Sequence, residues 1–382
     1  MDTHRKFHRW VLLVLSNVLL VAITSCAAGS EPASPDQLVA SDGFVCPEPN
    51  PRVEFESDTI NIFTWTEYVP YDIFDCFGAV YDVKVKVNYF SSNEELYSKV
   101  SLAENADQYD VVHPSDYMIG VFIREGILLE LDADRLPNLS NLDTSLITAY
   151  GESLNYLVPY QMGTQAIIYN SDTVKTPPAS WADLWNPEYE GRIVAVDDNR
   201  VIIGAALLTL GYDVNETDPD RLAEAEDKVT ALMPNILGFD SDNPSARLLS
   251  GEADLGIVWN GEAFLTISEA PKFKYVFPAE GSIIFYDGMA IPDTAPHPDA
   301  AYAWLNYLLQ DDVNWLLLAD YPYTNPNKAA LEYAKANQPK IYEAYINSPV
   351  TNTPANEFVR GHEVLDLGEA LLLYDEIWMR VK

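Results

Sequence analysis

Carboxylates recur with aromatic, hydroxyl or amide side chains at five places in the sequence. These places are Trp65-Thr66-Glu67-Tyr68, Ser115-Asp116-Tyr117, Asp197-Asp198-Asn199-Arg200, Trp259-Asn260-Gly261-Glu262 and Phe285-Tyr286-Asp287. A carboxylate neutralises an ammonium group through charge-assisted hydrogen bonds, and an aromatic face attracts both the cation and its methylene groups. The repeated pairing therefore indicates a site for an organic cation. For any single acid a solvated surface position is the ordinary alternative, and for any single aromatic residue it is the core.

Predicted β-strands end next to these places. The strands are expected over residues 60–65, 83–89, 109–112, 192–196 and 255–259, and helices over 70–77, 94–104, 202–210, 298–310 and 364–381. Their alternation is typical of the α/β class. Because ligands of open α/β sheets bind beyond the carboxyl ends of the strands, we expect the five places to border one crevice.

Motifs that carry catalysis are missing from the sequence. It contains no GxSxG, HExxH, P-loop or GxGxxG motif and no Cys/His cluster with metal-ligand spacing. His113, His297 and His362 are scattered, so we expect them in core or surface positions. Adjacent acids such as Asp197 and Asp198 could serve a glycoside hydrolase, but the candidate acids recur at several strand ends rather than as one facing pair. We predict no enzyme activity, no metal and no cofactor.

The N-terminus has the order of a bacterial lipoprotein signal. A basic start precedes a mostly apolar run over residues 10–23, which is too short for a stable membrane span. The residues Thr24-Ser25-Cys26 follow the run directly. We expect residues 1–25 to be removed, the Cys26 thiol to be lipidated, and residues 26–52 to form a tether with little to bury. An ordinary signal peptide followed by a coincidental cysteine is the alternative.

Two further cysteines and the charge balance bear on compartment and partners. Cys46 and Cys76 would meet oxidising conditions in an exported protein, which favours a disulfide, and two free thiols are the open alternative. The formal net charge of −35 argues against nucleic acid and anionic membrane surfaces as partners and fits a cationic ligand. The length beyond the tether suggests two domains.

Seven segments, spread over nearly all of the chain beyond the tether, match one known family. They are FTWTEYVP, YDVVHPSDY, SWADLWNPEYEGRI, FDSDNP, LGIVWNGEAF, YDGMAIP and NPNKAA. Through them the chain resembles the spermidine/putrescine-binding proteins of bacterial ABC importers. The resemblance implies an α/β, two-lobe periplasmic-binding-protein fold of type II, in which each lobe is an α/β sandwich and the ligand lies in the interlobe cleft. It places residues 53–161 and 286–331 in lobe 1, and residues 162–285 and 332–382 in lobe 2.

The resemblance also implies a ligand-binding set drawn from both lobes. The set is Trp65, Glu67, Tyr68, Ser115, Asp116, Tyr117, Asp198, Ser241, Trp259, Glu262, Phe285, Asp287 and Tyr323. Asp287 is expected to be the main ammonium partner and Glu67 to meet one amine end. Trp259 is expected to stack along the alkyl chain.

Departures from the family pattern concern the choice of ligand. Spermidine-preferring members carry a glutamate three residues after the position of Asp198, and Val201 stands there in this chain. Glu262, three residues after Trp259, resembles putrescine-preferring members, and Asp116 replaces an uncharged residue. The acids are rearranged rather than absent, which still indicates a polyamine and favours putrescine.

The combined prediction is a non-catalytic, extracytoplasmic polyamine-binding lipoprotein in the periplasm or at the outer face of the cell membrane. It would deliver putrescine or spermidine to the permease of an ABC importer by lobe closure. We expect a monomer that contacts the membrane through its lipid only and binds no nucleic acid. The alternatives are a binder of another organic cation, a polyamine receptor module for a membrane sensor, and a secreted carboxylate-pair hydrolase.

Overall fold

The computed structural model describes residues 38–41, 43–102 and 108–382. The predicted signal over residues 1–25 and the predicted lipid site at Cys26 lie outside the described residues. Among the residues that are described, no helix is both long and apolar enough to cross a membrane.

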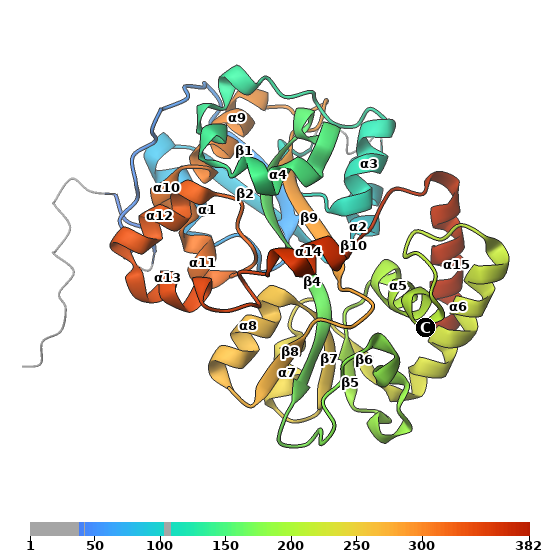
Figure 1. The fold of residues 1–382 in the computed structure, drawn as a ribbon. Coiled ribbons are helices and arrows are strands. Elements are labelled where there is room, and N and C mark those ends of the chain that lie inside the picture. The colour runs from blue at the N-terminus through green and yellow to red at the C-terminus, as the bar shows by residue number, and fades with distance from the viewer. Residues whose placement is uncertain (1–37, 42, 103–107) are drawn as a thin grey trace, which may run out of the picture. The chain divides into compact units, whose positions relative to one another are not determined.

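Strands and helices alternate along the described chain, which confirms the α/β class. The strands are β1 (Thr59–Trp65), β2 (Lys84–Phe90), β3 (Val111–Val112), β4 (Leu157–Asn170), β5 (Ile193–Ala195), β6 (Ile236–Phe239), β7 (Leu255–Trp259), β8 (Phe273–Val276), β9 (Ile283–Ala290) and β10 (His362–Glu363). The α-helices are α1 (Tyr71–Tyr81), α2 (Asn93–Val100), α3 (Asp116–Arg124), α4 (Thr144–Ile147), α5 (Asn199–Leu210), α6 (Pro219–Leu232), α7 (Pro244–Leu249), α8 (Asn260–Glu269), α9 (Pro298–Leu308), α10 (Asp311–Asn314), α11 (Leu316–Asp320), α12 (Lys328–Asn337), α13 (Pro339–Ile346), α14 (Ala355–Arg360) and α15 (Leu371–Val381). Figure 1 shows their arrangement.

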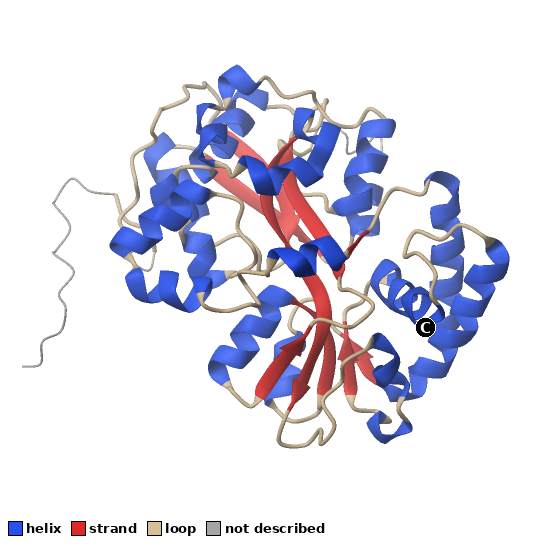
Figure 2. Cartoon of the chain, in the orientation of Figure 1, coloured by secondary structure: helices blue, strands red, loops and turns tan. Residues whose placement is uncertain are grey.

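Two groups of parallel strands make up the sheet. Its hydrogen-bonded order among the described residues is β2-β1-β3-β9-β4-β7-β5-β6, with β10 beside β9 and β8 beside β4. β1 runs parallel to β2 and β3, and β5 runs parallel to β6 and β7. β4 is antiparallel to both β9 and β7, and in Figure 2 it continues from one group of strands into the other. The two groups are the sheets of two lobes, joined by β4 and β9.

The strand β4 crosses between the lobes as one uninterrupted element. All 14 of its residues are buried, and its apolar and polar side chains do not alternate as they would in a strand with one exposed face. Leu157 pairs with Ala290 in β9, and Gln165 pairs with both Ile283 in β9 and Trp259 in β7. Close packing at the crossing requires glycine at position 163, because a Cβ there would collide with Asn260 Oδ1 and lie 2.7 Å from the ring of Phe285.

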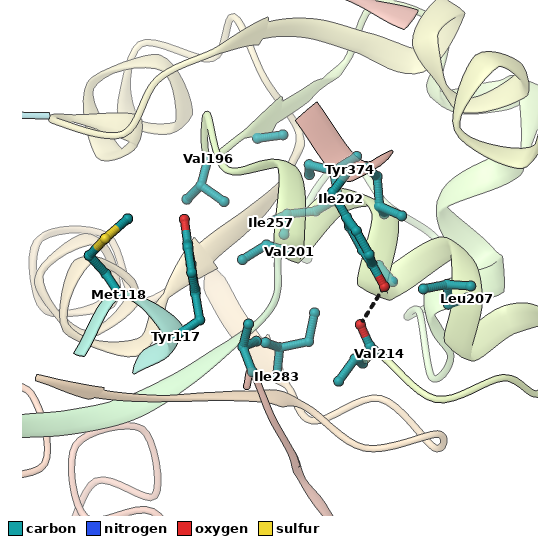
Figure 3. Close-up of a cluster of buried hydrophobic side chains, with 14 of the residues drawn as sticks. Tyr117, Met118, Val196, Val201, Ile202, Leu207, Val214, Ile257, Ile283 and Tyr374 are labelled. Carbon is teal, nitrogen blue, oxygen red and sulfur yellow. Dashed lines mark hydrogen bonds between the residues drawn. The ribbon is translucent and has the colours of Figure 1, made fainter. Parts of the chain in front are cut away.

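Separate hydrophobic clusters hold helices against each group of strands. In one cluster α1 and α9 pack together, and the ring of Phe74 lies parallel to Trp304 with centroids 5.2 Å apart. Another surrounds α5 and is drawn in Figure 3, where Ile202 and Leu207 lie near Ile257 of β7 and Tyr374 of α15. This second cluster fixes α5, whose N-terminus faces the cleft described below.

The predicted lobe boundaries stay predictions, but the packing bears on one of them. α12 and α13 contribute Ala334 and Tyr345 to the cluster that contains Trp304. Val350, in contrast, joins the cluster of Ile168 and Val258. We propose on this ground that the last crossing between the lobes falls near residues 346–350 rather than near residue 331.

All five predicted helices are observed, and each differs from its prediction at one or both ends. The last helix was expected from Val364, but α15 begins at Leu371. Asp366 accepts a hydrogen bond from the Gly368 amide, and Gly368 has φ +59°, so the chain turns there instead of continuing a helix. α2 ends at Val100 instead of running to residue 104, and residues 103–107 lie outside the described part of the chain.

Cys46 and Cys76 form a disulfide with their Cα atoms 5.0 Å apart, which decides between the disulfide and two free thiols. The bond joins the segment before β1 to α1. A short bridge between Val39 and Val45 closes the same segment on itself. The N-terminal segment described here is therefore fastened to lobe 1.

Candidate ligand-binding cleft

A cleft lies where β1, β7, β9 and the start of α5 meet. Its unoccupied space is about 680 Å³, a figure that includes the open mouth. The lining residues that the sequence predicts are Trp65, Glu67, Tyr68, Ser115, Asp198, Ser241, Trp259, Glu262, Phe285, Asp287 and Tyr323. The fold thus brings these members of the predicted set together, and their roles toward a ligand stay predictions.

Five further residues line the cleft without having been predicted. They are Thr66, Ser91, Asn93, Gln165 and Asp242. Ser91 and Asn93 directly follow β2, and Asp242 follows β6, so the rule that ligands bind beyond strand ends would have found them. Gln165 lies inside β4 and gives no such signal. With its amide oriented to accept from Trp259 Nε1 at 2.9 Å, it holds that indole in the cleft wall.

Asp287 lies at the base of the cleft, on β9. Tyr68 donates its hydroxyl to Oδ2 at 2.5 Å, and the backbone of Ser115 forms a bridge to Asp287. Burial raises the pKa of Asp287 to about 6, and the neighbouring hydroxyls of Ser115 and Tyr68 act in the opposite direction. Oδ1 is buried and has no hydrogen-bond partner among the described residues. Because an unpaired buried acceptor is costly, this oxygen is an acceptor ready for a donor from a ligand.

Aromatic rings and one neutral imidazole hold Tyr68 in place. The Tyr160 hydroxyl donates to the Tyr68 carbonyl at 2.8 Å, and the rings of Tyr160 and Tyr323 meet Tyr68 edge to face. His113 packs behind Tyr68 at 5.2 Å, and burial lowers its pKa to about 3. His113 is thus a neutral core residue, which is one of the two positions expected from the sequence, and Tyr68 is fixed before any ligand arrives.

Asp198 presents a second carboxylate, at the N-terminus of α5. One of its oxygens accepts from the amides of Arg200 at 2.9 Å and Val201 at 3.1 Å. Burial and the neighbouring Glu94 raise the pKa of Asp198 to about 6, while the two amides act in the opposite direction. A helix N-terminus favours negative charge, so the capping geometry holds the carboxylate against the cost of its burial.

Glu262 and Glu67 bring one acid from each lobe. Glu262 stands in the first turn of α8, and burial raises its pKa to about 7. A hydrogen bond with Ser245 acts against this rise, whereas the charges of Glu67 and Asp240 add to it. Glu67 is exposed and has φ +50°, a left-handed conformation in the turn after β1. Two acids that repel each other across the cleft are stabilised when a cation lies between them.

Apolar walls complete the cleft. The indole of Trp65 packs on Phe90 with centroids 4.5 Å apart, and its Nε1 is buried without a partner among the described residues. The ring of Phe285 meets the ring of Tyr323 edge to face at 5.7 Å. Gly261 allows this approach, because a Cβ there would lie 2.6 Å from the Tyr323 ring. The walls suit methylene groups, and the acids suit charged ends.

Asp116 and Tyr117 are the two remaining members of the predicted set. Asp116 begins α3, and its side chain lies outside what the structure describes. Tyr117 is buried, donates its hydroxyl to Glu94 at 2.6 Å and lies with its ring 5.3 Å from the guanidinium of Arg200. We therefore propose that Tyr117 supports the wall behind the cleft rather than touching the ligand.

Val201 occupies a core position. Its side chain is 1% exposed and lies within the cluster of Figure 3, close to Tyr117 and Ile257. It does not line the cleft. The position at which spermidine-preferring relatives are expected to carry a glutamate is therefore part of the hydrophobic packing of α5 here.

Comparison with known proteins places the chain in a family. Residues 72–345 match the model of the bacterial extracellular solute-binding proteins. Spermidine/putrescine-binding periplasmic protein 1 of Haemophilus influenzae is 35% identical over 330 residues, which cover 85% of this chain and 89% of that protein. The spermidine/putrescine-binding periplasmic protein of Salmonella typhimurium is 34% identical over 332 residues, covering 86% and 92%.

A solved structure agrees with these matches. The putative spermidine/putrescine ABC transporter from Listeria monocytogenes superposes with a TM-score of 0.79 at 27% identity, covering 85% of this chain and 99% of that one. The likeness confirms the predicted two-lobe periplasmic-binding-protein fold. The family is one of transporter binding proteins and not of enzymes. This chain belongs to the bacterial extracellular solute-binding protein family.

Proposed function

We propose that the protein binds a polyamine outside the cytoplasm and delivers putrescine or spermidine to the permease of an ABC importer. The observation that carries the proposal is Asp287, a buried carboxylate with one oxygen fixed by Tyr68 and the other unpaired in an aromatic-walled cleft. An ammonium group supplies the missing donor and a compensating charge together. The ligands in the names of the relatives support the same reading.

The charges of the cleft select against other classes of solute. Glu67, Asp198, Glu262 and Asp287 line it without a basic residue among the lining side chains of the described chain. An anion would be repelled, and a neutral sugar would leave the buried carboxylates without a counter-charge. A diamine or triamine places charge at its ends and methylenes along Trp65 and Trp259.

Lobe closure follows from the origin of the acids. Glu67 follows β1 and Asp287 lies in β9, whereas Asp198 caps α5 and Glu262 lies in the first turn of α8, in the other lobe. A cation between the two groups draws the lobes together, and without it the facing acids repel each other. The connections at β4 and β9 are the segments that would bend.

Binding without catalysis, a monomeric state and lipid anchoring complete the proposal. The family supports the first, and the sequence order around Cys26 supports the last. Cys26→Ser should leave the protein unprocessed or release it from the membrane fraction, and polyamine binding by the folded domain should stay unchanged. Equal membrane retention of the variant would show another anchor.

Calorimetric titration of the mature domain tests the binding proposal. Putrescine, cadaverine and spermidine should bind with about micromolar affinity, near −8 kcal/mol, while glucose and citrate show no heat of binding. Titration with agmatine tests for binding of guanidino cations, and titration with choline tests for binding of quaternary ammonium cations. Binding of choline with none of the three polyamines would replace the proposal by another cation, and binding of glucose or citrate alone would end it.

A further inference from the structure

A second cavity adjoins the ligand cleft and shares Ser91, Ser241 and Asp242 with it. Its unoccupied space is about 1090 Å³ including the mouth. We call this cavity the vestibule. Its lining includes the carboxylates of Glu94, Asp240, Asp242 and Asp375 and the rings of Phe239 and Trp378. The vestibule therefore has the side-chain chemistry of the cleft in a separate space beside it.

The carboxylates of the vestibule come from different elements that face one another. Glu94 belongs to α2 beside the first group of strands, whereas Asp375 belongs to α15, which packs on α5 and α6. Burial, and next the charge of Glu94, raise the pKa of Asp375. Arg247 lies 3.6 Å from Asp240, and among the described residues neither Asp242 nor Asp375 forms an ion pair. The vestibule thus has more negative charge than its own side chains neutralise.

An alkylammonium group of the chain already sits on this wall. The Lys382 Nζ lies 2.6 Å from both carboxylate oxygens of Asp197, another residue of the lining. The same Nζ lies 5.2 Å from the ring centre of Phe239 and 5.5 Å from that of Trp378. An ammonium held by a carboxylate over two aromatic faces is the arrangement that a polyamine end requires. This contact, and not acidity alone, indicates the class of ligand.

We propose that the vestibule binds the distal ammonium of a polyamine longer than a diamine, whose other end lies in the cleft. The inference rests on the proposed function and assigns a place to the further ammonium group of its triamine ligand, and to those of tetramines. The shared residues Ser91, Ser241 and Asp242 provide the continuous path that such a ligand needs. A metal ion does not fit as well, because no group of three or more His, Cys, Asp or Glu side chains in the described chain is arranged to hold one.

Two conservative variants separate the vestibule from the cleft. Asp375→Asn and Glu94→Gln remove charge but keep oxygens that can accept from Asn199 and Tyr117, as the native carboxylates do. Calorimetry with spermidine should show about five- to tenfold weaker binding for each variant, the cost of losing one charge-assisted contact. Putrescine affinity of Asp375→Asn should change by less than about twofold, since a diamine does not reach the vestibule. Glu94→Gln should leave putrescine binding no weaker, because loss of the Glu94 charge favours ionisation of Asp198 in the cleft.

Matched controls use exposed acids elsewhere. Asp227→Asn on α6 and Glu152→Gln make the same chemical changes on exposed residues and should leave both affinities unchanged. Thermal unfolding of each variant tests whether it is folded. Lys382→Gln gives a second, independent readout, because it removes the ammonium that lies over the rings of Phe239 and Trp378. It should tighten spermidine binding by about threefold and leave putrescine binding as it is.

The outcomes distinguish this inference from the proposed function. If putrescine and spermidine fail to bind the native domain, the proposed function is wrong. If both bind and the two vestibule variants weaken them equally or not at all, the vestibule inference alone is wrong. A competition experiment tests for an inorganic cation, by comparing magnesium chloride with sodium chloride of equal ionic strength. If magnesium chloride displaces spermidine more strongly from the native domain, and Asp375→Asn removes this difference, the vestibule is an inorganic cation site. That result would also overturn the inference.

Discussion

The two ends of the cleft hold their acids in different ways. At one end Asp287 is buried and already receives the Tyr68 hydroxyl, and the ring of Tyr68 is fixed by Tyr160 and Tyr323. At the other end Glu262 faces the exposed Glu67, which belongs to the opposite lobe. The first end is organised before a ligand enters, whereas the second is completed only when a cation brings two like charges together.

This difference teaches where affinity and closure each arise. A preorganised buried acceptor loses little entropy on binding, so most of the affinity should come from Asp287. Facing acids on two lobes contribute less to affinity but make closure depend on the ligand, because closing without a cation increases their repulsion. The following predictions test this division of roles, beginning with the largest expected effect.

Asp287→Asn should abolish most of the binding. The amide keeps an oxygen for the Tyr68 hydroxyl but cannot neutralise an ammonium, so we expect about 3–4 kcal/mol of lost affinity, several hundredfold. Calorimetry with putrescine measures the change. Asp293→Asn, an exposed acid just beyond β9, is the matched control. An Asp287→Asn domain that binds within threefold of the native one would contradict the assignment of affinity to this end.

Glu262→Gln should have a smaller effect on affinity and a clear effect on closure. We expect about 2 kcal/mol of lost affinity, near thirtyfold, because the contact is less buried than that of Asp287. The ligand-induced decrease in the radius of gyration, measured by small-angle X-ray scattering at saturating putrescine, should shrink as well. Glu269→Gln on the exposed side of the same helix is the control. A loss larger than that of Asp287→Asn would reverse the comparison.

Affinity should fall as the pH falls from 8 to about 6. Burial raises the pKa of Glu262 to about 7 and that of Asp287 to about 6, and a cation prefers both groups ionised. Ligand amines stay protonated in this range. Affinity is therefore highest above pH 7 and lost as these acids take up protons, by about tenfold between pH 8 and 6.

The same raised pKa values set the sign of a stability effect. Since the ligand-free fold holds these protons more tightly than the unfolded chain, ionisation of the two acids costs stability as the pH rises from about 4 to 7. The increase in Tm on adding putrescine should thus be larger at pH 8 than at pH 5.5. In a Glu262→Gln domain, the pH dependence of putrescine affinity should keep only the step near pH 6 that belongs to Asp287. An affinity independent of pH over this range would rule out a direct contact between the cation and either acid.

Tyr68→Phe should have the smallest effect of the series. The change removes one hydrogen bond to Asp287 and keeps the ring in its aromatic surroundings, so we expect about fivefold weaker putrescine binding. The pH midpoint of binding should also rise, because the Tyr68 hydroxyl lowers the pKa of Asp287. Tyr71→Phe, with a ring that is 60% exposed, is the control for loss of a tyrosine hydroxyl. A midpoint that stays in place would show that Tyr68 does not tune this carboxylate.

The strand ends and most cleft residues could be predicted from the sequence for a physical reason. Short runs of β-branched or aromatic residues predict strands such as β1 and β7. The sheet then places the residues that follow these strands at one edge. Trp65, Trp259 and Glu262 are found in this way. The α/β class follows from the same alternation, and the family resemblance supplied the two-lobe arrangement.

Other features depend on contacts that a linear sequence does not report. Gln165 lies within a fully buried strand and reaches the cleft only because β4 crosses between the lobes. Tyr117 looks like a cleft residue by position, yet the buried guanidinium of Arg200 occupies the space in front of its ring. The late start of α15 is set by the turn at Gly368, a local preference that outweighs the apolar periodicity before it. By comparison with the family pattern, Val201 replaces a ligand-binding glutamate, but in the fold its side chain is buried and packs in the core.

The crossing of β4 also limits how such a protein can be divided or recombined. One covalent strand supplies backbone hydrogen bonds to β9 on one side of the cleft and to β7 and β8 on the other. Each lobe is consequently assembled from stretches that lie far apart in the gene. A crossover between two related genes at any single point would mix strands within a lobe instead of exchanging whole lobes. Ligand preference in this lineage is therefore more readily inherited through single substitutions along the cleft than through the shuffling of intact parts.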